Sequence, residues 1–209
     1  MVGLFVAVPL ASFRVPQARE FFETFPCPPP ATVYGMLLSL VGETNRLRHQ
    51  GAEVAIGLLG KPASSVVLRT TWRVKDKKHG PGQGSNRIPD FQEVLSNLQL
   101  VVWVRAGAKE EGKSLAHRVD QVLSDPSKAN RFGGLSLGES TFLVNELSSL
   151  RQSEGNVDIL INDPQGTLAL PIWPNHVGSS GTVWGRYRME TLRLSDTVPE
   201  QAWTPIVSG

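Results

Sequence analysis

The sequence predicts an α+β fold with the element order βαββαβ, which is the order of ferredoxin-like and RRM-like domains. Two observations support this prediction. Segments of strand length alternate with two segments that carry apolar residues at helical spacing. The two most apolar strands, residues 2–10 and 98–105, are the first and third of the core, and these are the central strands of such a sheet. We therefore expect an antiparallel sheet with both helices on one face.

Residues 13–42 lead from the first strand into the first helix. Prolines at positions 26, 28 and 29 favour an extended approach, and Pro30 suits the first helical turn. The helix is expected to end near Gly42, because glycine is a common C-terminal cap. Within it, small residues recur three or four apart and form one narrow face: Thr32, Gly35, Ser39 and Gly42. Such a face lets another backbone approach closely, although ordinary packing of a helix on a sheet produces the same pattern.

A long, positively charged hairpin is predicted after the second strand, residues 52–59, which follows a basic loop containing Arg46, Arg48 and His49. Residues 64–75 alternate with period two, so one face is apolar and the other carries Arg69, Arg73 and Lys75. A polar, glycine-rich loop with Lys77 and Lys78 spans residues 76–90 and is expected to stay unpacked, and residues 91–95 read as the return strand. Residues 61–90 contain seven Lys and Arg but only two acids, whereas the whole chain has a net charge of +2. The charge favours an anionic ligand here, although a solvated edge hairpin protected by lysines is the alternative.

The second half of the core follows the third strand. Residues 110–124 form an amphipathic pattern typical of a helix, and residues 131–140 form a glycine-rich loop that leads into a strand at 141–147. Gly133, Gly134 and Ser136 in this loop could bring backbone N–H groups onto a phosphate, or could simply form a turn. Residues 148–209 read as a β-rich extension with strands near 157–161, 167–172 and 182–194, and with Trp203 docked from the tail. We therefore divide the chain into a domain of residues 1–147, with the hairpin at about 64–95, and an extension of residues 148–209.

Composition and motifs argue against several classes of protein. The single cysteine, Cys27, excludes an internal disulfide and a cysteine-based zinc site and favours a reducing, cytoplasmic setting. No apolar run has the length of a membrane span, and no nucleotide-binding loop or zinc-protease motif occurs. The four histidines are scattered, so we expect no metal, no cofactor and no catalytic residue. Basic loops and a glycine loop point instead to contacts with a nucleic-acid backbone, because the aromatic RNP1 pattern of RRM sheets is missing.

Two motifs resemble the Cas-five (Cas5) family, which comprises CRISPR-associated RAMP proteins of type I Cascade complexes. The first is the opening strand followed by Phe13-Arg14 and by residues 28–35, Pro-Pro-Pro-Ala-Thr-Val-Tyr-Gly. The second is the glycine loop at residues 133–140, Gly-Gly-Leu-Ser-Leu-Gly-Glu-Ser. The resemblance covers about residues 1–147 and is weaker in the last third. It implies a non-catalytic subunit that grips the 5′ handle of the crRNA, caps the backbone of the complex and supports RNA-guided targeting of DNA in antiviral defence.

The resemblance also implies partners and site residues. The expected partners are the crRNA handle, the Cascade backbone subunit, the large PAM-reading subunit and target DNA near the PAM, without a membrane. The hairpin matches the family's extended thumb. Residues carried over from the motifs, or chosen by charge in the case of Arg46 and Arg48, are Arg14, Thr32, Gly35, Arg46, Arg48, Arg69, Arg73, Lys75, Lys77, Lys78, Gly133, Gly134 and Ser136.

Two other functions remain open at this point. One branch of the family cleaves pre-crRNA without metal, using tyrosine, lysine and histidine, and Tyr34 with His49 would be the residues to test here. An RRM-like protein-interaction module that binds no RNA is the third hypothesis.

Overall fold

One mostly antiparallel sheet runs through the molecule in the strand order β6-β1-β5-β3-β7-β9-β8. The computed structural model describes residues 1–16, 21–72, 76–110, 112–151, 154–175 and 181–209. The central strand β5 (Arg87–Arg105) pairs antiparallel with β1 (Val2–Ala11) on one side and with β3 (Glu53–Leu58) on the other. On the far side of β1 lies β6 (Glu146–Ser149), also antiparallel. The apolar runs at residues 2–10 and 98–105 thus lie in neighbouring inner strands, as predicted.

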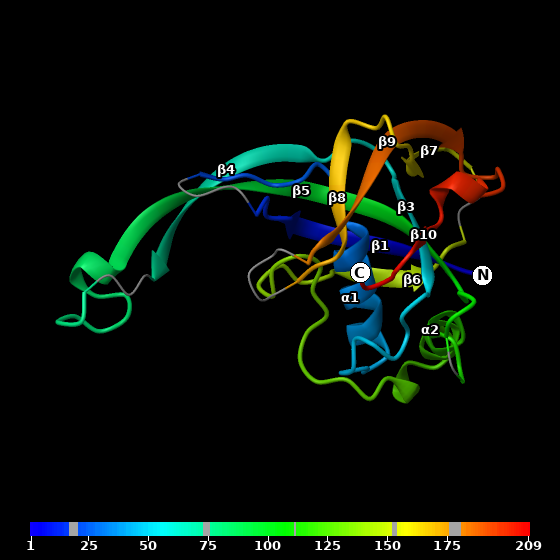
Figure 1. Cartoon of the computed structure of the whole chain (residues 1–209), viewed down its shortest axis with the longest axis horizontal. Helices are drawn as coiled ribbons and strands as arrows, with labels where there is room; N and C mark the ends of the chain where they lie inside the picture. The colour runs from blue at the N-terminus through cyan, green and yellow to red at the C-terminus, as the bar shows by residue number, and fades with distance from the viewer. Residues whose placement is uncertain (17–20, 73–75, 111, 152–153, 176–180) are drawn as a thin grey trace.

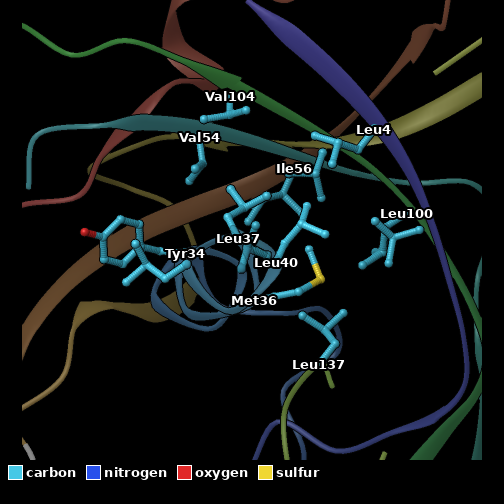
Figure 2. Close-up of a cluster of buried hydrophobic side chains, with 14 of the residues drawn as sticks. Leu4, Tyr34, Met36, Leu37, Leu40, Val54, Ile56, Leu100, Val104 and Leu137 are labelled. Atoms are coloured by element: carbon cyan, nitrogen blue, oxygen red, sulfur yellow. The ribbon is translucent and has the colours of Figure 1, made fainter. Parts of the chain in front are cut away.

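Helices α1 (Pro30–Leu40) and α2 (Leu115–Ser124) pack on the same face of this sheet. Figure 2 shows the resulting core, in which Leu37 and Met36 of α1 meet Leu4, Ile56 and Leu100 from three strands. The core follows the alternation of the strands, since the residues one step away, such as Ala55, Val101 and Trp103, form a second cluster on the opposite face. Pro30 occupies the first turn of α1, as predicted.

Strands β4 (Ala63–Trp72) and the first half of β5 form the predicted hairpin, which extends well beyond the body of the molecule (Figure 1). The structure corrects two details. The expected strands at 91–95 and 98–105 are one strand, because pairing with β1 continues on both sides of Asn97 although its φ is 54°. The loop at the tip, which was expected to stay unpacked, is ordered around the side chain of Asn86 in η1 (Gly84–Asn86). This side chain is buried and donates hydrogen bonds to the carbonyls of Asp76 and His79.

The C-terminal strands continue the same sheet. Strand β7 (Asn156–Asn162) pairs with β3, and β9 (Val183–Arg193) lies between β7 and β8 (Leu168–Trp173). The sheet curls so that β8 comes beside α1 (Figure 1). The tail adds η3 (Glu200–Ala202) and β10 (Thr204–Pro205), and Trp203 is buried as predicted, with the Arg105 guanidinium 4.4 Å from its ring.

The starts of two elements differ from the prediction. Helix α2 begins at Leu115 rather than near 110, because Gly112 has a φ of 72° and the Glu110 carboxylate accepts from the backbone N–H of Leu115. The last core strand begins at Glu146, since residues 141–145 turn to reach β1. The short strand β2 (Phe21–Phe22), parallel to β5, and the 3-10 turn η2 (Pro126–Lys128) complete the described elements. In the part of the chain described here, no helix is both long and apolar enough to cross a membrane.

Candidate functional site

A groove of about 540 Å³ opens along one side of α1. Its walls come from several places in the sequence: residues 12–16 after β1, Phe25, the helix itself, Arg46 in the turn after it, the glycine loop, and residues 171–174 at the end of β8. Of the residues predicted to bind RNA, the groove brings together Arg14, Thr32, Gly35, Arg46 and Ser136. Side chains separated by more than 100 positions in the chain thus share one cavity.

The open face of α1 is the narrow face of small residues. Thr32, Gly35 and Ser39 line the groove, whereas Gly42 lies beyond the end of the helix and packs against the Asn130 carbonyl. Gly35 and Ser39 are exposed although the helix is buried on its other sides. A Cβ placed on Gly35 would meet no atom within 4 Å. The helix backbone is therefore accessible from the groove, and no protein contact requires a glycine at this position.

The segment before α1 presents Arg14 at the groove. The Arg14 guanidinium lies 3.9 Å from the centre of the Phe22 ring, a cation–π contact that orients the side chain. Its neighbour Phe13 is buried, and the Phe13 backbone N–H donates to the Thr24 hydroxyl at 2.7 Å. Beside it, Ser12 lines the groove with a buried hydroxyl that has no hydrogen-bond partner within the described residues. A buried hydroxyl of this kind favours a ligand that can bond to it.

The glycine loop contributes Ser136, Gly138 and Glu139 to the groove wall. Leu137 anchors it in the main core. Gly138 has a φ of 89°, and a Cβ there would lie 2.5 Å from the Ser12 carbonyl oxygen, so only glycine lets the loop lie this close to the segment after β1. Gly133 and Gly134 belong to the same loop but do not line the groove.

The end of β8 supplies a wall that sequence reasoning missed. Trp173 is 8% exposed, and the Arg46 guanidinium lies 4.0 Å from the centre of its ring. Arg46 also donates from Nη2 to the Pro174 carbonyl at 3.1 Å, and the Tyr34 hydroxyl donates to the Arg46 carbonyl at 2.7 Å. These contacts fix Arg46 in the groove wall. The only local signal was a tryptophan followed by proline at the end of a predicted strand.

The groove meets the hairpin at a three-residue polar junction of Arg69, Gln92 and Glu139. Arg69 Nη1 lies 2.7 Å from Glu139 Oε2 and also donates to Gln92 Oε1, and Gln92 Nε2 donates to Glu139 Oε1 at 2.6 Å. The arginine-bearing face of the hairpin therefore turns toward the body at this point. Arg69 lies at the edge of the groove with its charge paired.

The opposite face of the hairpin carries exposed apolar side chains. Leu68 and Phe91, which face each other across the two strands, are 64% and 55% exposed, and Val66 and Phe21 extend the same patch. We call these four residues the hairpin patch. Because exposed apolar side chains cluster at protein contacts, the patch is a candidate docking surface.

Three further predicted residues, Arg48, Lys77 and Lys78, lie apart from the groove. Arg48 has a side chain 62% exposed, pairs with Glu43 at 3.3 Å and lines a separate hollow beside Lys109. Lys77 and Lys78 are exposed at the tip of the hairpin. Arg73 and Lys75 lie outside the described residues.

The two residues considered for RNA cleavage are both buried. The Tyr34 hydroxyl donates a hydrogen bond to the Arg46 carbonyl, and burial raises the pKa of Tyr34 to about 12. His49 is fully buried, with Nδ1 3.0 Å from Glu110 Oε1 and Nε2 2.9 Å from Arg118 Nη1. Because arginine only donates, His49 Nε2 must accept and Nδ1 carries the proton, so the ring is neutral, consistent with a pKa lowered by burial. Within the described residues, no group of three or more His, Cys, Asp or Glu could hold a metal ion.

Comparison with known proteins identifies relatives in both sequence and structure. No protein-family model matches the chain. CRISPR-associated protein Cas5 of Myxococcus xanthus is 40% identical over 212 residues, covering 100% of this chain and 99% of the relative. A solved chain described as a CRISPR RNA-guided surveillance complex matches with a TM-score of 0.61 at 13% identity, over 99% of this chain and 93% of its own. Another, described as a crystal structure of a Cas protein, matches with a TM-score of 0.53 at 14% identity, over 92% and 94%.

Proposed function

The chain belongs to the CRISPR-associated Cas5 family, and from this premise we propose that it is a non-catalytic Cascade subunit that holds the crRNA 5′ handle in the groove beside α1. One observation carries the proposal: Arg14, Thr32, Gly35, Arg46 and Ser136, chosen from separate segments of the sequence, line the same cavity. The likeness to a chain of an RNA-guided surveillance complex agrees with it in fold.

The arrangement of the core supports its assignment as a ferredoxin-like RAMP domain. In the order β6-β1-β5-β3, all neighbours are antiparallel, and the helices that connect the strands lie on one face. The hairpin of β4 and β5 occupies the place of the thumb. The groove and the hairpin lie at the same end of the sheet, where β1 ends and the hairpin half of β5 continues into the core.

The chemistry of the groove suits an RNA backbone rather than a base sequence. Arg14 and Arg46 supply positive charge, and the Ser136 and Thr32 hydroxyls supply hydrogen bonds. Phosphate and sugar contacts of this kind fix the position of a strand and leave sequence reading to base pairing. The exposed face of α1 at Gly35 lets the strand lie directly against the helix.

The thumb supplies the proposed contacts with the rest of the complex. The hairpin patch fits an apolar surface of the neighbouring backbone subunit, and Lys77 with Lys78 at the tip suits the guide RNA that runs along it. We also propose the large PAM-reading subunit and target DNA near the PAM as partners. The hairpin patch would then contact protein, and the lysines at the tip of the same hairpin would contact RNA.

The burial of Tyr34 and His49 supports a non-catalytic role. A tyrosine with a raised pKa, bonded to a carbonyl, is a poor base, and a buried histidine cannot reach a ribose hydroxyl in the groove. Incubating the purified chain with repeat RNA in EDTA tests this. Specific cleavage that disappears in Tyr34→Phe or His49→Gln would establish the endoribonuclease instead.

The groove itself is tested by Arg14→Ala in the co-expressed complex, with Arg193→Ala as the control, because Arg193 is also exposed but lies on β9 outside the groove. We expect Arg14→Ala to weaken binding of the co-purifying guide RNA and to lower the slope of log affinity against log salt by about 1. Binding that matches the control would refute the groove as the RNA site, and complexes that contain no RNA would favour the protein-interaction module.

A further inference from the structure

We propose that Arg46, stacked on Trp173, forms a shelf for one nucleobase of the bound RNA, so that the groove holds the RNA backbone on one side and this base on the other. The inference rests on the proposed function and makes it more specific. It assigns to Arg46 a stacking role in addition to its charge.

The geometry of the pair fits such a shelf. The guanidinium carbon of Arg46 lies over the indole ring, 4.0 Å from its centre, and the ring of Tyr34 contacts the indole in a tilted arrangement at a centroid distance of 6.2 Å. Arg46 is partly exposed and lines the groove, so its side chain is accessible to a ligand there. Planar guanidinium groups and aromatic rings are the usual platforms on which unpaired RNA bases stack.

The shelf is held rigidly from two directions. The side chain is tied by Nη2 to the Pro174 carbonyl, and the backbone is tied by its own carbonyl to the Tyr34 hydroxyl. A platform that is already ordered loses little conformational entropy when a base binds. A single cation–π contact on a flexible loop would not offer this advantage.

Arg46 and Trp173 also separate two hollows. Both residues line the groove and a neighbouring hollow of about 640 Å³, whose wall includes Thr44 and Asn45. The Asn45 side-chain oxygen accepts from the Leu47 N–H at 3.0 Å, and among the described residues its amide nitrogen is not engaged by that bond and can donate to a base edge. A base turned out of the groove across this ridge would therefore stack on Arg46 and meet polar groups beyond it.

The stacking role is separable from charge by Arg46→Lys. Lysine keeps the positive charge and can reach a carbonyl, but it lacks the flat face. Arg48→Lys is the matched control, because it is the same exchange two positions away, in a side chain that lines a different hollow. Trp173→Phe keeps an aromatic ring beneath Arg46 and serves as a second variant that preserves the shelf.

The experiment uses guide RNA sequenced from the purified complex and resynthesised with one abasic position at a time. For the wild-type chain, we expect one position near the 5′ end where removal of the base lowers affinity about tenfold. Arg46→Lys should abolish the difference between the abasic and intact RNA at that position, whereas Arg48→Lys and Trp173→Phe should retain it.

The possible failures are distinguishable. If the wild-type chain binds RNA but shows no such position, or if Arg46→Lys retains the dependence, the shelf is refuted while the groove stands. If the wild-type chain does not bind the guide RNA at all, the proposed function fails and the shelf falls with it. Melting curves of each variant show whether a loss of binding reflects a loss of folding.

Discussion

Substitution of Gly35 should change stability and RNA binding in opposite directions. The position is in the interior of α1 and exposed to the groove, and a Cβ there meets no atom within 4 Å. Glycine inside a helix is less stable than alanine by roughly 0.5–1 kcal/mol. Because nothing opposes the added methyl group, Gly35→Ala should raise the melting temperature by about 1–4 °C.

The same position should not tolerate a large side chain if RNA lies on the helix. Gly35→Leu can fold, since its side chain enters the groove rather than the core, but it would occupy the space of the ligand. A steric conflict of roughly 1–3 kcal/mol corresponds to about a 5- to 150-fold loss of affinity. Gly35→Glu adds a negative charge beside Arg14 and Arg46 and should weaken binding most at low salt.

Fluorescence anisotropy with labelled guide RNA measures binding, and thermal melting of the same samples measures stability. His117→Glu is the control for charge, because His117 is exposed on α2 and does not line the groove. The reasoning is refuted if Gly35→Leu folds and binds RNA as tightly as the wild-type chain. It is also refuted if Gly35→Ala lowers the melting temperature, since an unseen contact would then need the glycine.

Three further predictions concern the loop, the hairpin and a buried histidine. Gly138→Ala should lower the free energy of unfolding by about 1–3 kcal/mol in melting experiments and weaken RNA binding, because the φ of Gly138 is 89° and the added Cβ would meet the Ser12 carbonyl. Gly133→Ala is the control and should have a smaller effect, because Gly133 also has a positive φ but its Cβ would meet no neighbour. Leu68→Glu with Phe91→Glu should leave the melting temperature unchanged but prevent co-purification with the backbone subunit, and Leu47→Glu, at another exposed leucine, should not. Burial lowers the pKa of His49 below 6.5, so the unfolded chain binds a proton that the native chain does not. Stability should therefore fall as pH drops below about 6.5, and pH-dependent melting should show a smaller fall in His49→Gln.

Sequence patterns located helices and strands correctly where the structure depends on residues that are close together in the sequence. The proline run and the helical spacing after it located α1, and the period-two alternation located β4, because both depend on contacts within a few residues. The predicted break between two strands at residues 96–97 was wrong, because it was inferred from the local sequence alone. Polar residues at 96–97 are typical of a turn, but the strand continues because partners on both sides supply its hydrogen bonds.

The site depends on contacts that no local pattern contains. Trp173 and Pro174 approach Arg46 across more than 120 positions, and this approach follows from the curl of the sheet that brings β8 to α1. The inward turn of Arg69 was missed because its partner Glu139 lies 70 positions away in the glycine loop. Sequence alternation showed that the hairpin has two chemically different faces, but only the packing of the loop decides which face is open.

The Arg69 junction also explains why the groove and the hairpin should be regarded as one surface. Glu139 lines the groove, and both of its carboxylate oxygens are bonded to hairpin residues, Arg69 and Gln92. The carboxylate therefore does not oppose an incoming phosphate as a lone charge would, because the guanidinium beside it offsets the repulsion. In the proposed complex, an RNA strand that leaves the groove past Ser136 meets Arg69 next and is directed along the hairpin. In this proposal, a rigid junction here would fix the angle between RNA in the groove and RNA along the hairpin.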